Sequence, residues 1–239
     1  MTLYPLRDDT CLLALPMHEG EGNIFYDHSR YSHNATFYGD TTDWLDSPFG
    51  KVIFFAGTDN YYAKVSGHEI MSKIAETKAL TVTVWINTGE DGQILYDCHG
   101  FPYPLCGMIE LALKDDGKIY WNGGGTNGWD CPETSESFND GQWHFIAALA
   151  DHSISRIYVD GELKSEGTGW SEWNPSWTDS DEILYIGTNY PEGSDLFSDF
   201  LCDLRIYNRV LSQEEIKALE LYYRNFEVRP SILCPRPTL

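Results

Sequence analysis

The chain alternates apolar and polar residues over short segments, and this alternation predicts β-strands. Residues 79–86 read Ala-Leu-Thr-Val-Thr-Val-Trp-Ile, which places every second side chain on one face of a strand. Turn sequences rich in Asp, Asn and Gly, such as residues 115–117 and 139–141, separate the apolar segments. Short strands joined by such turns predict an all-β protein, either a sandwich or a jelly roll.

The most distinctive segment predicts two strands closed by a tight turn. Trp143 and His144 open an apolar strand, and residues 156–159 form the next strand. The pair Asp160-Gly161 follows, and this dipeptide is typical of a two-residue hairpin turn. We therefore expect a buried strand, a second strand and a tight turn in this order.

One helix is predicted, near the C-terminus. Ser212 can cap its first turn, and Glu215 stands at the third helical position, as a capping box requires. Residues 1–223 are predicted to form one domain, because no linker or repeat interrupts the sequence and β-sandwiches of this length often stay undivided. Residues 224–239 form a tail rich in Pro and Arg, which we expect to lie extended across the acidic domain or to dock on a partner subunit.

The chain is strongly acidic, with 16 Lys and Arg residues against 37 Asp and Glu residues and a formal net charge of −21. This balance argues against nucleic acid and anionic lipid as partners, since neutralising phosphates requires clustered basic side chains. No segment approaches the roughly 20 apolar residues of a membrane span. Insertion into a membrane is therefore not expected.

Five segments carry motifs that belong together in one fold: residues 12–34, 79–86, 140–163, 183–188 and 200–216. In this order they resemble the laminin-G-like, concanavalin A-like lectin/glucanase superfamily, and the resemblance covers residues 9–223. It implies an antiparallel β-sandwich of the jelly-roll type with one short C-terminal helix. Proteins of this family mostly hold sugars or other surfaces, and only some of them cut sugars.

Catalysis is not expected, because the sequence lacks the paired carboxylates of a glycosidase. Such enzymes hold two carboxylates about 5–5.5 Å or about 6.5–9.5 Å apart, which favours acidic residues two or four positions apart on one strand face. Residues 179–182 come closest but are predicted to lie in a loop, and Glu110 stands alone between two apolar residues. A glycoside hydrolase or polysaccharide lyase is therefore the third choice of function.

The resemblance also implies a structural Ca²⁺ ion where the loop after the first strand meets the last strand. Asp27 and Asn34 occupy this loop, and Asp203 stands at the acidic position of the last strand. Calcium takes about six to eight oxygen ligands, many of them from the backbone, so few side chains are needed. The alternative is that Asp27 and Asn34 only cap turns. Thr36 departs from the family pattern, because glycine is usual at its position.

Two polar segments rich in tryptophan are the candidate ligand-binding loops. Residues 120–129 combine Trp, Asn and Gly, and residues 170–177 place three tryptophans in a stretch without strand periodicity. Aromatic faces stack on the C–H faces of sugars while short polar side chains bind hydroxyl groups. The alternative is that these rings fold back and cover the end of the sandwich. The candidate residues are Trp121, Asn122, Asn127, Trp129, Trp170, Trp173 and Trp177.

The six cysteines do not indicate a zinc module, since the sequence has no C-x-x-C pair. Cys98 and Cys106 bracket a loop that a disulfide could close. The resemblance makes the strands of Cys11 and Cys202 neighbours, so these two are either bonded or small buried hydrophobic residues. The disulfide pairing stays open for Cys11, Cys98, Cys106, Cys131, Cys202 and Cys234.

These observations predict a non-catalytic module, stabilised by calcium, that binds a glycan or surface polysaccharide. The alternative is a structural or decoration protein of a virion or cell surface, which uses the same fold for protein contacts or self-association through the tail. Both functions place the protein outside the cell or on a particle surface. Residues 1–9 lack the basic start and apolar run of a secretory signal. We therefore expect either a leader that this sequence does not include or release by lysis as part of a virus particle.

Overall fold

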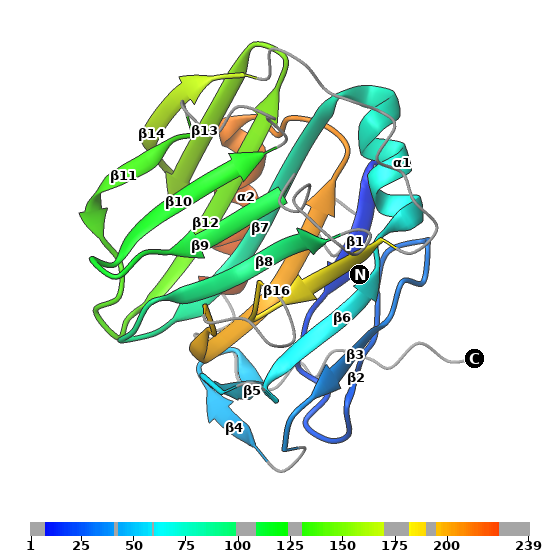
Figure 1. Ribbon diagram of the computed structural model, residues 1–239, viewed down its shortest axis with the longest axis vertical. Coiled ribbons are helices and arrows are strands. Elements are labelled where there is room, and N and C mark those ends of the chain that lie inside the picture. The colour runs from blue at the N-terminus through cyan, green and yellow to red at the C-terminus, as the bar shows by residue number, and fades with distance from the viewer. Residues whose placement is uncertain are drawn as a thin grey trace.

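The computed structural model describes residues 8–40, 43–58, 60–98, 109–123, 131–169, 182–189 and 195–224. These residues form two sheets of antiparallel strands that pack face to face, with two helices (Figure 1). The predicted all-β sandwich is confirmed. The tail from residue 225 onward lies outside the described residues.

Sheet A contains the first and last strands of the domain. Its strands are β1 (Cys11–Leu15), β4 (Trp44–Ser47), β5 (Gly50–Ala56), β7 (Ala79–Asn87), β12 (Trp143–Asp151), β13 (Ile154–Val159), β14 (Glu162–Thr168) and β16 (Ser198–Tyr207). They follow the order β14-β13-β12-β7-β16-β5-β4, and β1 pairs with the second half of β16.

Sheet B lies in front of sheet A in the view of Figure 1. Its strands are β2 (Ile24–Phe25), β3 (Ala35–Tyr38), β6 (Tyr62–Ser66), β8 (Gly92–Cys98), β9 (Ile109–Leu113), β10 (Lys118–Gly123), β11 (Glu133–Ser137) and β15 (Ile183–Ile186). They follow the order β11-β10-β9-β8-β15-β6-β3-β2. The apolar core lies between the sheets: Phe37 of β3 packs on Phe55 of β5 at a ring distance of 5.4 Å.

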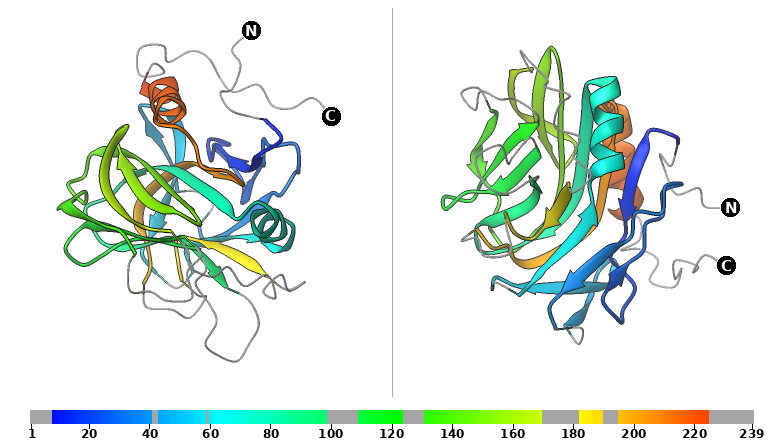
Figure 2. Two further views of the ribbon diagram at one scale, coloured as in Figure 1. Left: turned by 90° about the horizontal axis from the view of Figure 1, so that it is seen from above. Right: turned by 45° about the vertical axis from the view of Figure 1, so that its right-hand side comes forward.

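The C-terminal helix α2 (Gln213–Arg224) begins with the predicted capping box. The backbone N–H of Ser212 donates to the Glu215 carboxylate at 2.8 Å, and the N–H of Glu215 donates to the Ser212 hydroxyl at 3.3 Å. Ile216 and Leu219 are buried, as predicted. The helix lies on the outer side of sheet A, away from sheet B (Figure 2).

A further helix, α1 (His68–Thr77), is an addition to the predicted fold. Ile70, Met71 and Ile74 are buried, which explains why this segment packs as a helix. Its N-cap residue is Gly67, which makes no side-chain capping bond, so the start signal that marks α2 is missing. α1 lies at the side of the sandwich, beside both sheets (Figure 2). In the described part of the chain, neither helix is long and apolar enough to cross a bilayer.

The hairpin predicted after Trp143 is present. β12 pairs with β7 on one side and with β13 on the other. Asp160 and Gly161 have φ angles of 51° and 73°, the left-handed conformation that a tight turn of the I′ type requires at both central positions. Trp143 itself is only partly buried and packs against Phe49 at a ring distance of 4.9 Å.

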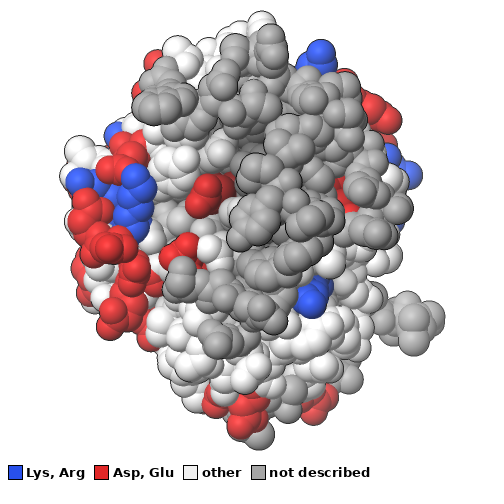
Figure 3. All heavy atoms as spheres, viewed as in Figure 1, with Lys and Arg blue, Asp and Glu red and all other residues white. Residues whose placement is uncertain are grey.

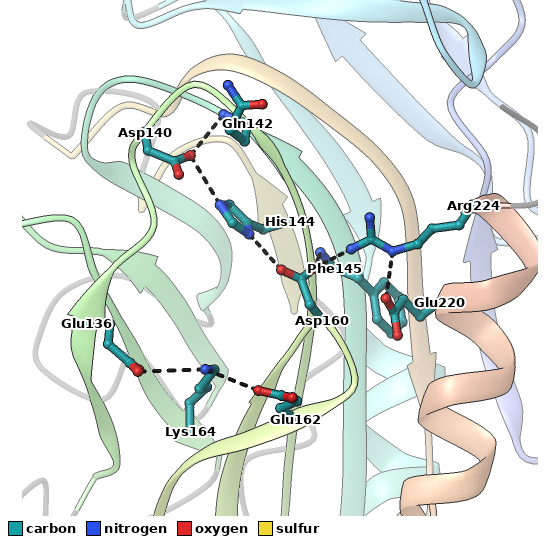
Figure 4. Close-up of polar contacts among 10 residues, drawn as sticks. All are labelled: Glu136, Asp140, Gln142, His144, Phe145, Asp160, Glu162, Lys164, Glu220 and Arg224. Carbon is teal, nitrogen blue, oxygen red and sulfur yellow. Dashed lines mark hydrogen bonds and ion pairs between the residues drawn. The ribbon is translucent and has the colours of Figure 1, made fainter.

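A chain of polar contacts ties this hairpin to α2 (Figure 4). His144 lies between the carboxylates of Asp140 and Asp160, at N–O distances of 3.1 Å and 2.9 Å. Asp160 also accepts a hydrogen bond from Arg224 of α2 at 3.0 Å. Burial of the ring opposes its protonation, but the two carboxylates outweigh burial and raise the pKa of His144. The most distinctive motif of the sequence therefore has a structural role.

Cys11 and Cys202 are both buried and are not joined by a disulfide. Cys11 lies opposite Tyr207 at the end of β16, whereas Cys202 lies near the middle of that strand. Burial raises the pKa of the Cys11 thiol to about 12, so it behaves as a small hydrophobic residue. The Cys98 side chain, Cys106 and Cys234 lie outside the described residues.

Candidate ligand-binding face

Asp27, a predicted calcium ligand, organises the loop after β1. Its Oδ1 accepts hydrogen bonds from the backbone N–H groups of Ala14 and Ser29, each at 2.8 Å. Its Oδ2 accepts the N–H of His33 at 2.8 Å. Asn34, a second predicted ligand, accepts the N–H of Asp27 through its side-chain oxygen at 2.9 Å. Both side chains thus form the turn contacts that the alternative interpretation predicts.

Asp203, the third predicted ligand, is buried in β16 beside a guanidinium group. It accepts hydrogen bonds from Nε of Arg205 at 2.9 Å and 3.1 Å. A cation bound here would face this buried positive charge, and the Asp27 oxygens are already engaged by three backbone N–H groups. The arrangement therefore does not fit a calcium ion. Within the described residues, no three His, Cys, Asp or Glu side chains form a group that could hold a metal. Calcium binding stays a prediction, to be tested by a measurement in solution.

An acidic pair that the sequence does not reveal lies where β8 meets β15. Asp97 stands opposite Leu184 in the strand pairing, and Glu182 immediately precedes β15. The Glu182 side chain acts on the titration of the Asp97 carboxyl group, and the two residues are 1% and 0% exposed. Burial raises the pKa of Asp97 to about 7, because an ionised carboxylate would be poorly hydrated at this position, and the Glu182 side chain acts in the opposite direction. The pair therefore retains a proton up to about neutral pH.

This acidic pair does not supply the chemistry of a glycosidase. Catalytic carboxylates stand about 5–5.5 Å or about 6.5–9.5 Å apart with the scissile bond between them. Asp97 and Glu182 are instead both buried in the core, and burial separates them from any substrate on the surface. The pair is a feature of the core and gives no support to hydrolysis.

Trp121, a predicted ligand-binding residue, belongs to the core, which corrects that prediction. Its side chain is fully buried, and its indole N–H donates to the carbonyl of Leu149 in sheet A at 3.2 Å. Strand β10 extends through Gly123, so Trp121 lies in a strand rather than in a loop. A ring enclosed between two sheets has no face free to stack on a sugar. Its neighbour Asn122 points to the opposite face of the strand and is half-buried.

The remaining predicted contacts lie outside the described residues: Asn127, Trp129, Trp170, Trp173 and Trp177. The described residues next to their segments are nevertheless informative. One segment follows Gly123 of β10, which pairs with Ile109 at the start of β9. The other precedes Ile183 of β15, which pairs with Cys98 at the end of β8. Because β8 and β9 are antiparallel, these flanking residues lie at the same end of sheet B.

The outer face of sheet B carries a row of polar and aromatic side chains. Each member lies directly opposite the next across neighbouring strands β10, β9, β8, β15 and β6: Asn122, Glu110, Tyr96, Tyr185 and Lys64. The adjacent positions in these strands, such as Leu111 and Leu184, point into the core. Neighbouring strands are about 4.8 Å apart, so the row forms a continuous band across the sheet.

Three tyrosine rings surround Lys64 at one end of this row. Its Nζ lies 5.0 Å from the ring centroid of Tyr38, 5.4 Å from that of Tyr62 and 5.6 Å from that of Tyr185. The rings of Tyr38 and Tyr62 stack at 5.0 Å. Tyr38 is 43% exposed, whereas Tyr62 and Tyr185 are 9% and 5% exposed. This tyrosine–lysine cluster therefore opens to solvent at Tyr38.

The other end of the row presents hydrogen-bonding groups of a different kind. Burial, followed by the charge of Asp195, raises the pKa of Glu110, although Lys114 acts in the opposite direction. The Asn122 amide lies opposite Glu110 on the next strand. The amide both donates and accepts hydrogen bonds and the carboxyl group accepts them, which suits hydroxyl groups of a ligand.

Charged side chains are unevenly spread over this face (Figure 3). Acidic and basic groups gather over β10 and β11, where Lys114 pairs with Glu133 and Lys118 pairs with Asp116. Over β6 and β15 the described surface is largely uncharged, with a small basic area. The face thus has a charged side and an aromatic side.

A family model described as the concanavalin A-like lectin/glucanases superfamily matches residues 57–217, more than half of the chain. The chain belongs to this superfamily. The predicted resemblance is confirmed, and the superfamily name includes both lectins and glucanases. A search of curated protein sequences finds no match to this chain.

Solved structures support the superfamily fold at low sequence identity. A Trypanosoma rangeli sialidase in complex with 2,3-difluorosialic acid is 16% identical with a TM-score of 0.64, and the match covers 90% of this chain and 33% of that chain. The receptor-binding domain of botulinum neurotoxin C/D mosaic serotype is 17% identical with a TM-score of 0.59, covering 91% and 51%. The binding domain of botulinum neurotoxin DC in complex with SialylT is 14% identical with a TM-score of 0.60, covering 91% and 52%. This chain therefore spans only part of each of these proteins.

Proposed function

We propose that this protein is a non-catalytic carbohydrate-binding module whose ligand lies on the outer face of sheet B. The observation that carries the proposal is the row from Asn122 to Lys64, which sets amide, carboxyl, phenol and ammonium groups on adjacent strands. Sugars offer hydroxyl groups to such polar groups and C–H faces to aromatic rings. A rigid sheet also loses little conformational entropy when a ligand binds.

The similar structures support this class of ligand. The sialidase structure contains 2,3-difluorosialic acid, and the botulinum neurotoxin DC structure contains SialylT. The nature of the ligand must nevertheless come from the surface of this chain, because the identities of 14–16% indicate only a shared fold. A surface glycan as ligand would place the protein outside the cell or on a particle surface, and this location is part of the proposal.

The predicted tryptophan contacts remain part of the proposal. The described residues that flank the segments of Trp129 and Trp173 lie at one end of sheet B. A ligand on the outer face that reaches this end of the sheet would come close to these flanking residues. Hydrolysis is not proposed, since the acidic pair of Asp97 and Glu182 is buried.

A glycan array tests the proposal when it compares the protein with two matched variants. Tyr38→Ala removes the most exposed ring of the tyrosine–lysine cluster, and Tyr222→Ala removes a ring from α2, behind sheet A. We expect Tyr38→Ala to weaken binding at least about tenfold, equivalent to about 1.4 kcal/mol, and Tyr222→Ala to leave it unchanged. A folded protein that binds no carbohydrate would contradict the proposal, as would equal binding by the protein and Tyr38→Ala.

A further inference from the structure

We infer that the ligand of this face is an acidic sugar and that Lys64 binds its carboxylate; this inference rests on the proposed function. The first observation concerns the surroundings of Lys64, which differ from those of the lysines that form ion pairs. Five other lysines form ion pairs with Asp or Glu: Lys51, Lys73, Lys114, Lys118 and Lys164. Among the described residues, Lys64 contacts three aromatic rings and has no carboxylate within ion-pair distance.

The tyrosine rings hold the Lys64 ammonium group without saturating it. Aromatic faces attract a cation through their quadrupole. The face of an aromatic ring has no lone pair that could accept a conventional hydrogen bond. The ammonium group, which has three N–H donors, therefore keeps its capacity to donate to a ligand. Lys64 is half-buried between strands and is held in place by Tyr38, Tyr62 and Tyr185. A positioned cation with donors to spare is suited to an anionic oxygen.

The charge of the whole protein makes this position selective. With a net charge of −21, the surface repels an acidic ligand over most of its area. Acidic and basic groups gather over β10 and β11 (Figure 3), whereas Lys64 of β6 is surrounded by the rings of three tyrosines. An acidic sugar would therefore place its carboxylate at Lys64 and its hydroxyl groups toward Glu110. The row thus fixes a direction for the bound chain.

The spacing of the strands indicates an oligosaccharide rather than a single sugar ring. Lys64 on β6 and Glu110 on β9 are three strand spacings apart, about 14 Å. Tyr38, which is 43% exposed, offers accessible aromatic surface beside Lys64 for the C–H groups of a sugar. A phosphate ion or a short acidic peptide would use the Lys64 charge but would gain little from this ring and from Glu110. The combination favours a carboxylated sugar chain.

The test compares acidic sugars with the same sugars after their charge has been removed. Sialyllactose and tri-galacturonic acid are titrated by calorimetry beside their methyl esters, using the full chain. Lys64→Met keeps a linear side chain against the tyrosine rings but removes the charge. Lys64→Arg keeps the charge, and Lys217→Met removes an exposed lysine from α2 as a control.

We expect at least one of the two acids to bind about 10- to 100-fold more tightly than its ester, as for a hydrogen bond to a charged group. Lys64→Met should abolish this preference, while Lys64→Arg and Lys217→Met should retain it. Equal affinities for acid and ester, or a preference that survives in Lys64→Met, would overturn the inference but leave the proposed function standing. If no sugar on a broad array binds, charged or neutral, both fail. If Lys64→Met does not fold, the inference is tested by comparing acid and ester binding to the parent protein and to Lys64→Arg.

Discussion

The buried pair of Asp97 and Glu182 predicts an unusual pH dependence of stability. Burial raises the pKa of Asp97 from the ordinary 3.8 to about 7. The folded protein then holds this proton more tightly than the unfolded chain does. The contribution of the protonated Asp97 carboxyl group to the free energy of unfolding is therefore fully present below about pH 4 and is lost as the pH rises through about 7. The shift of about 3 pH units corresponds to a loss on the order of 4 kcal/mol.

Asp97→Asn should remove this dependence, because asparagine does not titrate and its amide can donate to the Glu182 carboxylate. Urea denaturation from about pH 4.5 to about pH 8.5 gives the free energy of unfolding for both proteins. Relative to the parent protein, the variant should gain several kcal/mol as the pH rises across this range. Asp91→Asn removes an exposed carboxylate just before β8 and should show no such gain.

A stability difference between the parent protein and Asp97→Asn that stays constant with pH, to within about 1 kcal/mol, would refute this reasoning. It would mean that Asp97 ionises in the folded protein at the same pH as in the unfolded chain. The carboxyl group would then be hydrated or paired with a cation, and not enclosed in the core beside Glu182.

Three further outcomes are expected. Trp121→Ala should lower the free energy of unfolding by about 3–5 kcal/mol in urea denaturation, because the ring is fully buried, and a loss under about 1 kcal/mol would place it on the surface. His144→Gln should cost more stability at about pH 5.5 than at about pH 8.5, because the raised pKa of His144 gives stability that is present below its ordinary value of 6.5 and is lost as the pH rises through the folded value. Melting with and without EDTA tests the calcium prediction: a lower melting temperature in EDTA supports it, and the hydrogen bonds of Asp27 favour no change.

The parts of the fold that the sequence predicts are those with local signals. The turn at Asp160 and Gly161 depends on two adjacent residues that tolerate positive φ, and it is present. The capping box of α2 depends on two residues three positions apart, Ser212 and Glu215. Helix α1 lacks both kinds of signal, because its N-cap is Gly67 and its apolar face has only three buried residues.

The features that sequence reasoning misses are made by strand pairing between distant segments. Asp97 and Glu182 are neighbours only because β15 lies beside β8 in sheet B. In the same way, Lys64 and Tyr185 lie opposite each other across β6 and β15. Alternation in each strand shows that Lys64 faces away from the core, but the sequence does not give the strand order. No pattern in the sequence therefore predicts the row.

The correction at Trp121 also has a physical reason. The glycine-rich composition after residue 122 favours a loop, and the sequence predicts that this loop includes Trp121. The strand instead continues to Gly123, with Ile119 and Trp121 on its inner face. Residues 119–121 alternate between apolar and polar over only three positions. Such a short alternation does not distinguish a strand from a loop in the sequence.

The central claim is that carbohydrate binds to the outer face of sheet B. The most direct measurement is an NMR titration of the labelled protein with the best oligosaccharide from the array, following backbone and Lys side-chain signals. We expect the largest chemical-shift changes in β3, β6, β15, β8 and β9, with Tyr38 and Lys64 among the affected residues. Changes centred on α2 and the outer side of sheet A, with sheet B unaffected, would contradict it.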